Sequence, residues 1–230
     1  MECIFAPEFD KLSELLEIAE PEFSHIKALR LKEGESCYLT NGKNLGGIGE
    51  LIAISKKSCT LKVTKVIENM GETGTEIVLA LGILSNRDRF EFALEKAIEL
   101  GIIEFIPLST KFSQKDKINV ARLEAKAIAA IKQCRRSLLP KIHSQMSLEK
   151  ALEYCKTEQI ILADENGAKA NTIEIPIKKK LCFFVGPEGG FSDEELTQIA
   201  KAAIKLNLGI RRLRAETAAI AAISAVTLPR

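Results

Sequence analysis

Histidine is scarce in this sequence, and closely spaced cysteines are missing. The 230 residues include two histidines and six cysteines, and no two of the cysteines form a Cys-x-x-Cys pair. Structural zinc sites are usually built from such pairs together with histidines. We therefore expect no metal site in this chain.

A secretory leader and long apolar runs are also missing. The first residues, MECIFAPEFDKLSELLE, are acidic and contain no basic start followed by an apolar segment. No stretch approaches the ~20 consecutive apolar residues that span a bilayer. We expect a cytoplasmic protein with reduced thiols and no membrane partner.

Two further absences narrow the functional classes. No Gly-x-Gly-x-x-Gly pattern follows an early strand, which counts against a Rossmann-type oxidoreductase. A strong excess of one charge is also lacking, because the formal net charge is +2. The charge is nevertheless uneven, since residues 1–75 sum to −3 and residues 76–230 to +5.

The composition supports a sizeable core, with 46% hydrophobic and 28% charged residues. The N-terminal third contains short β-type segments separated by turn clusters at 41–44 and 46–47, which predicts a small barrel. We expect a short helix over 21–31 and strands over 35–40, 49–55 and 58–66. Residues 69–75, with two glycines and two threonines, predict a linker.

After this linker, apolar runs alternate with stripes of helical period such as Phe90, Leu94 and Ala97. Strands that alternate with helices predict an α/β domain with a parallel sheet. We therefore divide the chain into a barrel over 1–70 and an α/β domain over 76–230. Within the α/β domain we expect strands over 77–84, 102–108, 160–163 and 181–185, and a short extended piece over 208–210. We expect one helix that ends at Gly101 and three others over 119–134, 192–206 and 217–226.

The densest motif is Gly186-Pro187-Glu188-Gly189-Gly190, between a buried strand and a helix that opens with Ser192. Ligands of open α/β sheets bind at the carboxyl ends of strands, and glycine lets backbone approach a ligand closely. The alternative is a sharp strand-to-helix turn without a ligand.

A second motif places Arg211, Arg212 and Arg214 just before Glu216 and Thr217. Arginine binds RNA phosphate and stacks on bases. Glu216 and Thr217 are equally explained as a helix cap.

Two weaker basic segments complete the candidates. Gln133 is followed by Arg135 and Arg136 at the end of a helix, where the helix dipole alone favours cations. Arg87 and Arg89 flank Asp88, which is a possible N-cap.

Taken in order, these segments resemble the ribosomal RNA small subunit methyltransferase E family, which consists of SPOUT enzymes that methylate N3 of uridine. The resemblance covers nearly the whole chain and is strongest at 186–190 and 208–218. Residues 89–108 are similar to the family's first helix and next strand of this domain, and 25–30 to its PUA-like barrel. The sequence departs from the family at Ser85-Asn86, Ile210, Arg212 and Ala215.

The resemblance implies a deep trefoil knot in the C-terminal half, S-adenosylmethionine as cofactor, and a homodimer that acts on small-subunit rRNA or the assembled small subunit. Residues that match positions near the cofactor, or lie in the same motifs, are Leu108, Gly186, Pro187, Glu188, Gly189, Gly190, Leu208, Gly209, Leu213 and Thr217. Candidate catalytic residues are Gln133, Arg136, Glu188, Arg214 and Glu216. Candidate RNA-binding residues are Arg30, Lys32, Arg87, Arg89, Arg135, Arg136 and Arg211.

For methyl transfer to uridine N3, Arg136 and Arg214 would stabilise the developing anion. Either Glu188 or Glu216 would accept the proton, or no dedicated base is needed. Two competing functions stay open: a SPOUT enzyme acting on tRNA or a ribose hydroxyl, and a non-catalytic RNA-binding assembly factor.

Overall fold

The computed structural model describes residues 1–114, 117–169 and 180–227. The chain forms two compact units. The first contains Met1–Thr73 and Ile128–Leu139, and the second contains Gly74–Ala127 and Pro140–Arg230. The first unit thus includes a late segment that the boundary expected from the sequence assigns to the α/β domain.

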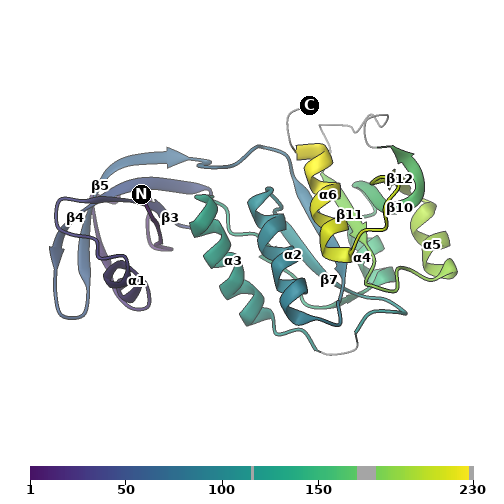
Figure 1. The fold of residues 1–230 in the computed structure, drawn as a ribbon. Helices are drawn as coiled ribbons and strands as arrows, with labels where there is room; N and C mark the ends of the chain where they lie inside the picture. Colours follow the sequence, from purple (N-terminus) through teal and green to yellow (C-terminus); the bar gives the residue numbers. More distant parts are fainter. Residues whose placement is uncertain (115–116, 170–179, 228–230) are drawn as a thin grey trace. The chain divides into compact units, whose positions relative to one another are not determined.

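The first unit is built on a small, mostly antiparallel sheet (Figure 1). Its elements are β1 (Cys3–Phe5), β2 (Leu15–Ile18), α1 (Glu22–Ala28), β3 (Ser36–Thr40), β4 (Leu45–Ile54) and β5 (Cys59–Glu68). The strand order is β1-β3-β4-β5-β2, and β1 pairs with β3 in parallel. The expected helix and three strands are confirmed. The two N-terminal strands are additional, and they are short segments within an acidic stretch.

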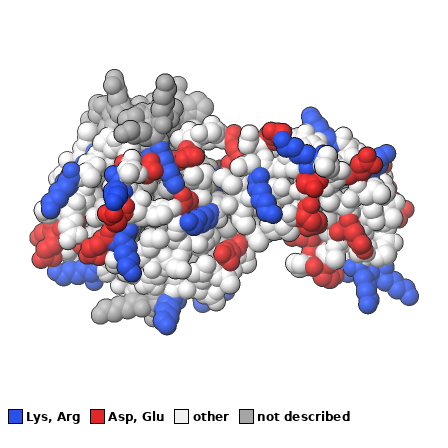
Figure 2. All heavy atoms as spheres, turned by 180° about the vertical axis from the view of Figure 1, so that it is seen from behind, with Lys and Arg blue, Asp and Glu red and all other residues white. Residues whose placement is uncertain are grey.

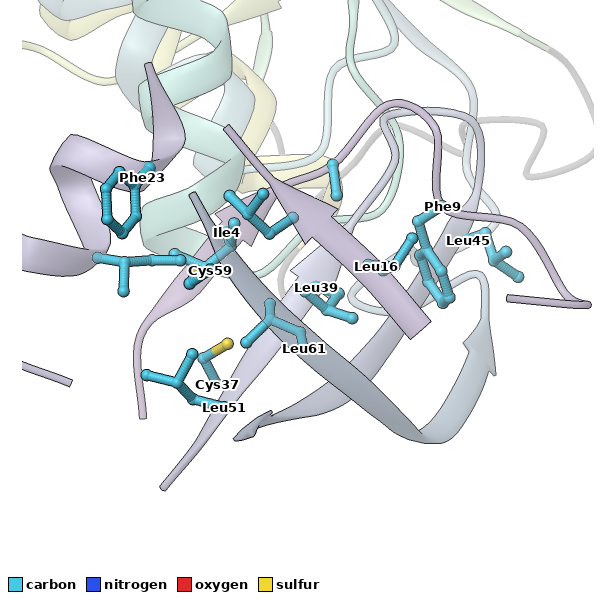
Figure 3. Packing of buried hydrophobic residues seen from close by; sticks show 13 residues of the cluster. Ile4, Phe9, Leu16, Phe23, Cys37, Leu39, Leu45, Leu51, Cys59 and Leu61 are labelled. Carbon is cyan, nitrogen blue, oxygen red and sulfur yellow. The ribbon is translucent and has the colours of Figure 1, made fainter. Parts of the chain in front are cut away.

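Apolar side chains from four strands converge in the core of this unit (Figure 3). Ile4, Leu39, Leu51 and Leu61 come from β1, β3, β4 and β5 and are fully buried. Close approach of the backbone requires a glycine on β4. A Cβ on Gly47 would lie 2.6 Å from the carbonyl oxygen of a residue on β5.

The second unit contains a parallel sheet. Its described elements are β6 (Ile77–Gly82), α2 (Arg87–Glu99), β7 (Glu104–Ser109), β8 (Lys141–Ile142), β9 (Met146–Ser147), α4 (Leu148–Tyr154), β10 (Gln159–Lys169), β11 (Leu181–Val185), α5 (Asp193–Ala200), β12 (Ala203–Asn207) and α6 (Ala215–Thr227). The helix α3 (Val120–Cys134) begins in residues of the second unit and ends in residues of the first. The sheet order is β12-β10-β11-β6-β7-β8, with β9 also paired to β7.

Helices cover both faces of this sheet (Figure 1). On one face, α4 and α5 pack on a cluster that includes Val78, Ile106 and Phe184. Along each strand, residues that point to the other face alternate with these. On that other face, Phe90 of α2 packs against Phe105 of β7, with ring centroids 5.4 Å apart. The expected α/β class with a parallel sheet is therefore confirmed, whereas the knot stays a prediction.

Two expected elements are wrong near the C-terminus. The helix that opens at Ser192 ends at Ala200, not near residue 206. The next residues form β12, which pairs with β10. The short extended piece expected over 208–210 lies outside any strand. Pairing with a distant strand decides the conformation here, and a local pattern does not contain that information. No helix within the described ranges has the length and apolarity to cross a membrane.

Candidate functional site

A pocket of about 590 Å³ lies in the second unit, at the carboxyl ends of its parallel strands. Two loops form most of its wall: Gly186–Gly190, which we call the glycine loop, and 208–214, which we call the arginine loop. The first follows β11 and the second follows β12. Because β10 lies between these strands and all three run parallel, both loops emerge at the same edge of the sheet. The volume is typical of a small-molecule site.

The glycine loop is closely packed. A Cβ on Gly82, the last residue of β6, would lie 2.4 Å from the ring nitrogen of Pro187. Gly190 has a φ of 71°, in the region that favours glycine. The helix after the loop starts with a complete capping box between Ser192 and Glu195, which confirms the predicted helix start.

Glu188 is held by donors from the start of the α2 segment. Its carboxylate accepts from Ser85 Oγ at 2.8 Å, from Ser85 N at 3.2 Å and from Arg89 Nη2 at 3.2 Å. Burial alone would raise the pKa of Glu188, but hydrogen bonds from backbone amides and Ser85, and the charge of Arg89, outweigh it and lower the pKa. Glu188 is therefore a firmly ionised carboxylate.

Arg89 also contacts a second candidate acid. Its Nη1 lies 3.5 Å from Oε1 of Glu216, in the first turn of α6. Glu216 is 7% exposed, and its Oε2 has no hydrogen-bond partner among the described residues. The sequence predicted that Arg89 binds RNA. In the structure its guanidinium group instead lies between the carboxylates of Glu188 and Glu216. The N-cap of α2 is Asn86 rather than Asp88, because the Asn86 side chain accepts from Arg89 N.

The arginine loop contributes exposed positive charge to the pocket. Arg211, Arg212 and Arg214 all line it and are exposed. Within the described part of the chain, no acidic side chain forms an ion pair with them. These guanidinium groups are therefore available to an anionic ligand.

Most of the predicted cofactor and catalytic residues of the second unit meet in this pocket. The predicted residues that line it are Gly186, Pro187, Glu188, Gly189, Gly190, Leu208, Gly209, Arg211, Leu213 and Arg214. Five others do not line it, and two of these, Arg89 and Glu216, are the ion pair described above. Leu108 is fully buried in β7, Thr217 is exposed on α6, and Arg87 is exposed with its Nε 3.9 Å from Glu91.

A third part of the pocket wall was not predicted from the sequence. Ala163, Asp164 and Glu165 line the pocket from β10. Burial alone would raise the pKa of Asp164, but the ion pair with Lys205 at 2.9 Å and the amide of Asn166 lower it. The available signal was an acid pair that closely follows the buried apolar residues at the start of β10. Other lining residues that were not among the predicted site residues are Val185, Phe191, Leu196, Leu206, Arg212, Ala215 and Ala218.

The remaining candidates belong to the first unit. Arg136 is 2% exposed, and its Nη2 lies 2.7 Å from Oε2 of Glu72. The same carboxylate accepts from the amides of Ser137 and Leu138 at 3.1 and 2.9 Å. Arg136 was predicted to act on the target base and on RNA, but this geometry makes it a buried structural cation.

Arg135 is also used within the first unit. Its guanidinium lies 4.6 Å from the ring centroid of Tyr38, and its Nη2 donates to the carbonyl of Met1 at 3.0 Å. Gln133, Arg30 and Lys32 are exposed, as RNA contacts would require. On the face drawn in Figure 2, basic side chains are interspersed with acidic ones, so this face offers no broad basic field.

Protein-family comparisons agree with this architecture. The family model of the RNA methyltransferase domain matches residues 71–227, and that of the RNA methyltransferase PUA domain matches residues 18–64. Ribosomal RNA small subunit methyltransferase E of Mesomycoplasma hyopneumoniae is 34% identical, over 86% of this chain and 87% of the relative. The protein of the same name from Rickettsia conorii is 31% identical, over 93% and 89%.

Solved structures give the same result. Ribosomal RNA small subunit methyltransferase E from Neisseria gonorrhoeae, bound to S-adenosyl methionine, matches with a TM-score of 0.88 and 27% identity, over 98% of this chain and 96% of that one. A Legionella pneumophila putative methyltransferase in complex with the same cofactor matches with a TM-score of 0.83 and 29% identity, over 96% and 95%. The expected PUA-like unit is confirmed, and the chain belongs to the ribosomal RNA small subunit methyltransferase E family of RNA methyltransferases.

Proposed function

We propose that this protein uses S-adenosylmethionine to methylate N3 of a uridine in small-subunit ribosomal RNA. The observation that carries the proposal is the pocket between the glycine and arginine loops, in a chain whose structural neighbours bind this cofactor. Family membership supports RNA methylation, and the uridine N3 target is our inference from the resemblance of the motifs.

The residues present fit the cofactor. The pocket volume of about 590 Å³ is within the range of small-molecule sites. Gly186, Gly189 and Gly209 expose backbone at its wall, where adenine and ribose hydroxyls need donors and acceptors at close range. Leu208 and Leu213 supply apolar contacts for the base.

The bound cofactor would supply a methyl group already activated on a sulfonium, so positioning of the nucleobase accounts for much of the expected rate. In the reaction, uridine N3 loses its proton, forms a bond to the methyl carbon, and the carbon–sulfur bond breaks to leave a thioether. Arg214, exposed at the pocket, stabilises the negative charge that develops on the uracil ring.

Neither candidate carboxylate is well suited to remove the proton. Glu188 already accepts from Ser85 and Arg89, and its lowered pKa makes it a weak base. Glu216 is buried and faces Arg89. We infer that both carboxylates hold Arg89 and the two loops in place. The proton from uridine N3 is then transferred to solvent water. This is the mechanism without a dedicated base.

Residues of the first unit have other assignments. Arg136 has a structural role through Glu72. Gln133 stays a predicted contact of the target base. We propose that the PUA-like unit clamps RNA through Arg30 and Lys32, and that the active protein is a cytoplasmic homodimer, as the family resemblance implies.

The test uses tritiated S-adenosylmethionine with small ribosomal subunits, naked rRNA and tRNA as separate acceptors. Transfer to small-subunit RNA supports the proposal, and transfer to tRNA alone contradicts it. Absence of cofactor binding in calorimetry would favour the non-catalytic assembly factor.

A further inference from the structure

Phe112 presents a half-exposed aromatic ring in the turn that follows β7. Its exposed fraction is 50%. Single exposed apolar side chains are common on protein surfaces, so exposure alone does not indicate a partner. The position of Phe112 beside the pocket is what distinguishes it.

The turn that carries Phe112 is well fixed by hydrogen bonds. Thr110 N donates to Ser113 Oγ at 2.8 Å, and Lys111 N donates to Glu195 Oε1 at 2.8 Å. Gln114 N donates to the carbonyl of Ile83 at 3.1 Å. The ring is therefore presented from an ordered backbone.

The side chain of Phe112 packs on the glycine loop. A Cβ on Gly189 would lie 2.8 Å from Phe112 Cβ and 3.3 Å from Cγ, so this contact depends on the missing side chain of Gly189. Gly189 also lines the pocket. One end of Phe112 is thus anchored beside the cofactor pocket, while half of its surface faces solvent.

The surroundings of the ring suit a nucleobase. No other aromatic ring of the described residues stacks on it. Lys111 Nζ lies 5.9 Å from the ring centroid and 3.4 Å from Oε2 of the exposed Glu194. Arg211 and Arg214 contribute positive charge to the adjoining pocket. RNA-binding proteins commonly stack exposed bases on aromatic rings beside cations that contact the phosphates.

We propose that Phe112 is a stacking platform for a nucleobase of the RNA substrate at the mouth of the pocket. The inference rests on the proposed RNA methylation and assigns a positioning residue to it. Phe112 takes no part in the chemical step.

The first test compares substitutions at this position in methyl transfer to small ribosomal subunits. Phe112→Ala raises the KM for RNA about tenfold, the loss expected for one base–aromatic stack, with kcat and the cofactor Kd within about twofold of the wild type. Phe112→Tyr restores the KM, and Phe112→Leu, which keeps apolar bulk without an aromatic face, does not. An unchanged KM in Phe112→Ala, or rescue by leucine equal to that by tyrosine, overturns the proposal.

The second test needs no methyl transfer. The chain has no tryptophan, so Phe112→Trp introduces a single tryptophan at the platform, which can be excited at wavelengths where the two tyrosines do not absorb. Phe92→Trp is the matched control, because Phe92 is 45% exposed with Lys96 Nζ 5.7 Å from its ring, lies on α2 and is not part of the pocket wall.

Titration with a 16S rRNA transcript quenches the tryptophan at 112 and leaves that at 92 unchanged. Equal responses at both positions overturn the proposal. The proposal is also overturned if the emission at position 112 does not change with RNA but changes with protein concentration, because that result would place residue 112 against a second copy of the chain. If the wild type transfers no methyl group, the proposed function fails, whereas selective quenching at 112 still supports an RNA-stacking residue.

Discussion

Arg89 Nη2 lies 3.2 Å from Glu188 Oε1, and this ion pair joins the first turn of α2 to the glycine loop. The same guanidinium lies 3.5 Å from Glu216, in the first turn of the helix after the arginine loop. One side chain therefore connects the elements that carry both walls of the pocket. Such support of a binding site from behind its lining residues determines how firmly the site is preorganised.

Replacement of Arg89 by methionine leaves two carboxylates without their shared cation. We expect the free energy of unfolding to fall by about 1–2 kcal/mol and the cofactor Kd to rise about tenfold. Urea unfolding and calorimetry measure these changes. Arg87→Met is the control, because Arg87 is 73% exposed and approaches Glu91 only to 3.9 Å, and it should change stability by less than about 0.5 kcal/mol.

If Arg89→Met keeps its stability and cofactor affinity but loses RNA affinity, Arg89 is an RNA ligand. That was the role predicted from the sequence.

Arg136 and Glu72 form an ion pair at 2.7 Å, with side chains 2% and 12% exposed. Removal of one partner leaves an uncompensated charge in a buried place, so Arg136→Met should lower the unfolding free energy by about 3 kcal/mol. The neighbouring variant Arg135→Met removes an exposed guanidinium and should cost less than about 1 kcal/mol. If Arg136→Met has normal stability but no longer transfers methyl groups, Arg136 has the catalytic role that was predicted from the sequence.

Glu104 forms the centre of a polar cluster at the start of β7. Its Oε2 lies 2.6 Å from the hydroxyl of Tyr154 and 2.5 Å from His143 Nε2, and its Oε1 pairs with Lys180. Burial alone would raise the pKa of Glu104, but hydrogen bonds with Lys180, Tyr154 and His143 outweigh it and lower the pKa to about 2. The hydrogen bond to Glu104 raises the pKa of Tyr154 to about 12.

A carboxyl group whose pKa is lower in the folded state stabilises the fold above its unfolded pKa of about 4.5, and this contribution is lost as the pH falls toward 2. Glu104→Gln should therefore be less stable than the wild type by about 2–3 kcal/mol at pH 7, and the difference should shrink between pH 4.5 and pH 2. Urea unfolding across this range measures it. If the wild type and Glu104→Gln differ in unfolding free energy by the same amount at pH 7 and at pH 3, then ionisation of Glu104 does not contribute to stability.

The sequence predicted those features that local pattern determines. The capping box at Ser192, the buried strand before Gly186 and the fold class all follow from short-range signals. The end of α5 was not predictable in this way, because β12 exists only through its pairing with β10. The short strands β1 and β2 depend in the same way on partners far along the chain.

The residues of the candidate site also differ in whether local sequence pattern reveals them. Residues in glycine-rich and arginine-rich segments were found because their composition is unusual. Asp164 was missed because its acid pair with Glu165 is only a weak local signal, and the pairing of β10 with β11 and β12 is what brings it to the pocket. Arg89 and Arg136 were recognised as important, but their partners Glu188, Glu216 and Glu72 are distant in sequence. A cation on RNA and a cation in an internal ion pair look the same in a single sequence.

Arg214 is the exposed cation that we assign to the uracil anion. Arg214→Ala should reduce kcat by about 100-fold, as for removal of one donor to a developing anion, while the cofactor Kd stays within about twofold of the wild type. Single-turnover transfer and calorimetry separate the two effects. Arg214→Lys, which keeps the charge but not the planar fork, should retain part of the rate. A parallel loss of cofactor binding would show that Arg214 belongs to the cofactor site instead.

The central claim is that the pocket delivers a methyl group to uridine N3 of small-subunit rRNA. The most direct measurement is mass mapping of nucleosides from that RNA after incubation with the protein and S-adenosylmethionine carrying a deuterated methyl group. We expect a single labelled uridine with the methyl group on N3. A label on a ribose hydroxyl, on another base or on no nucleoside would contradict it.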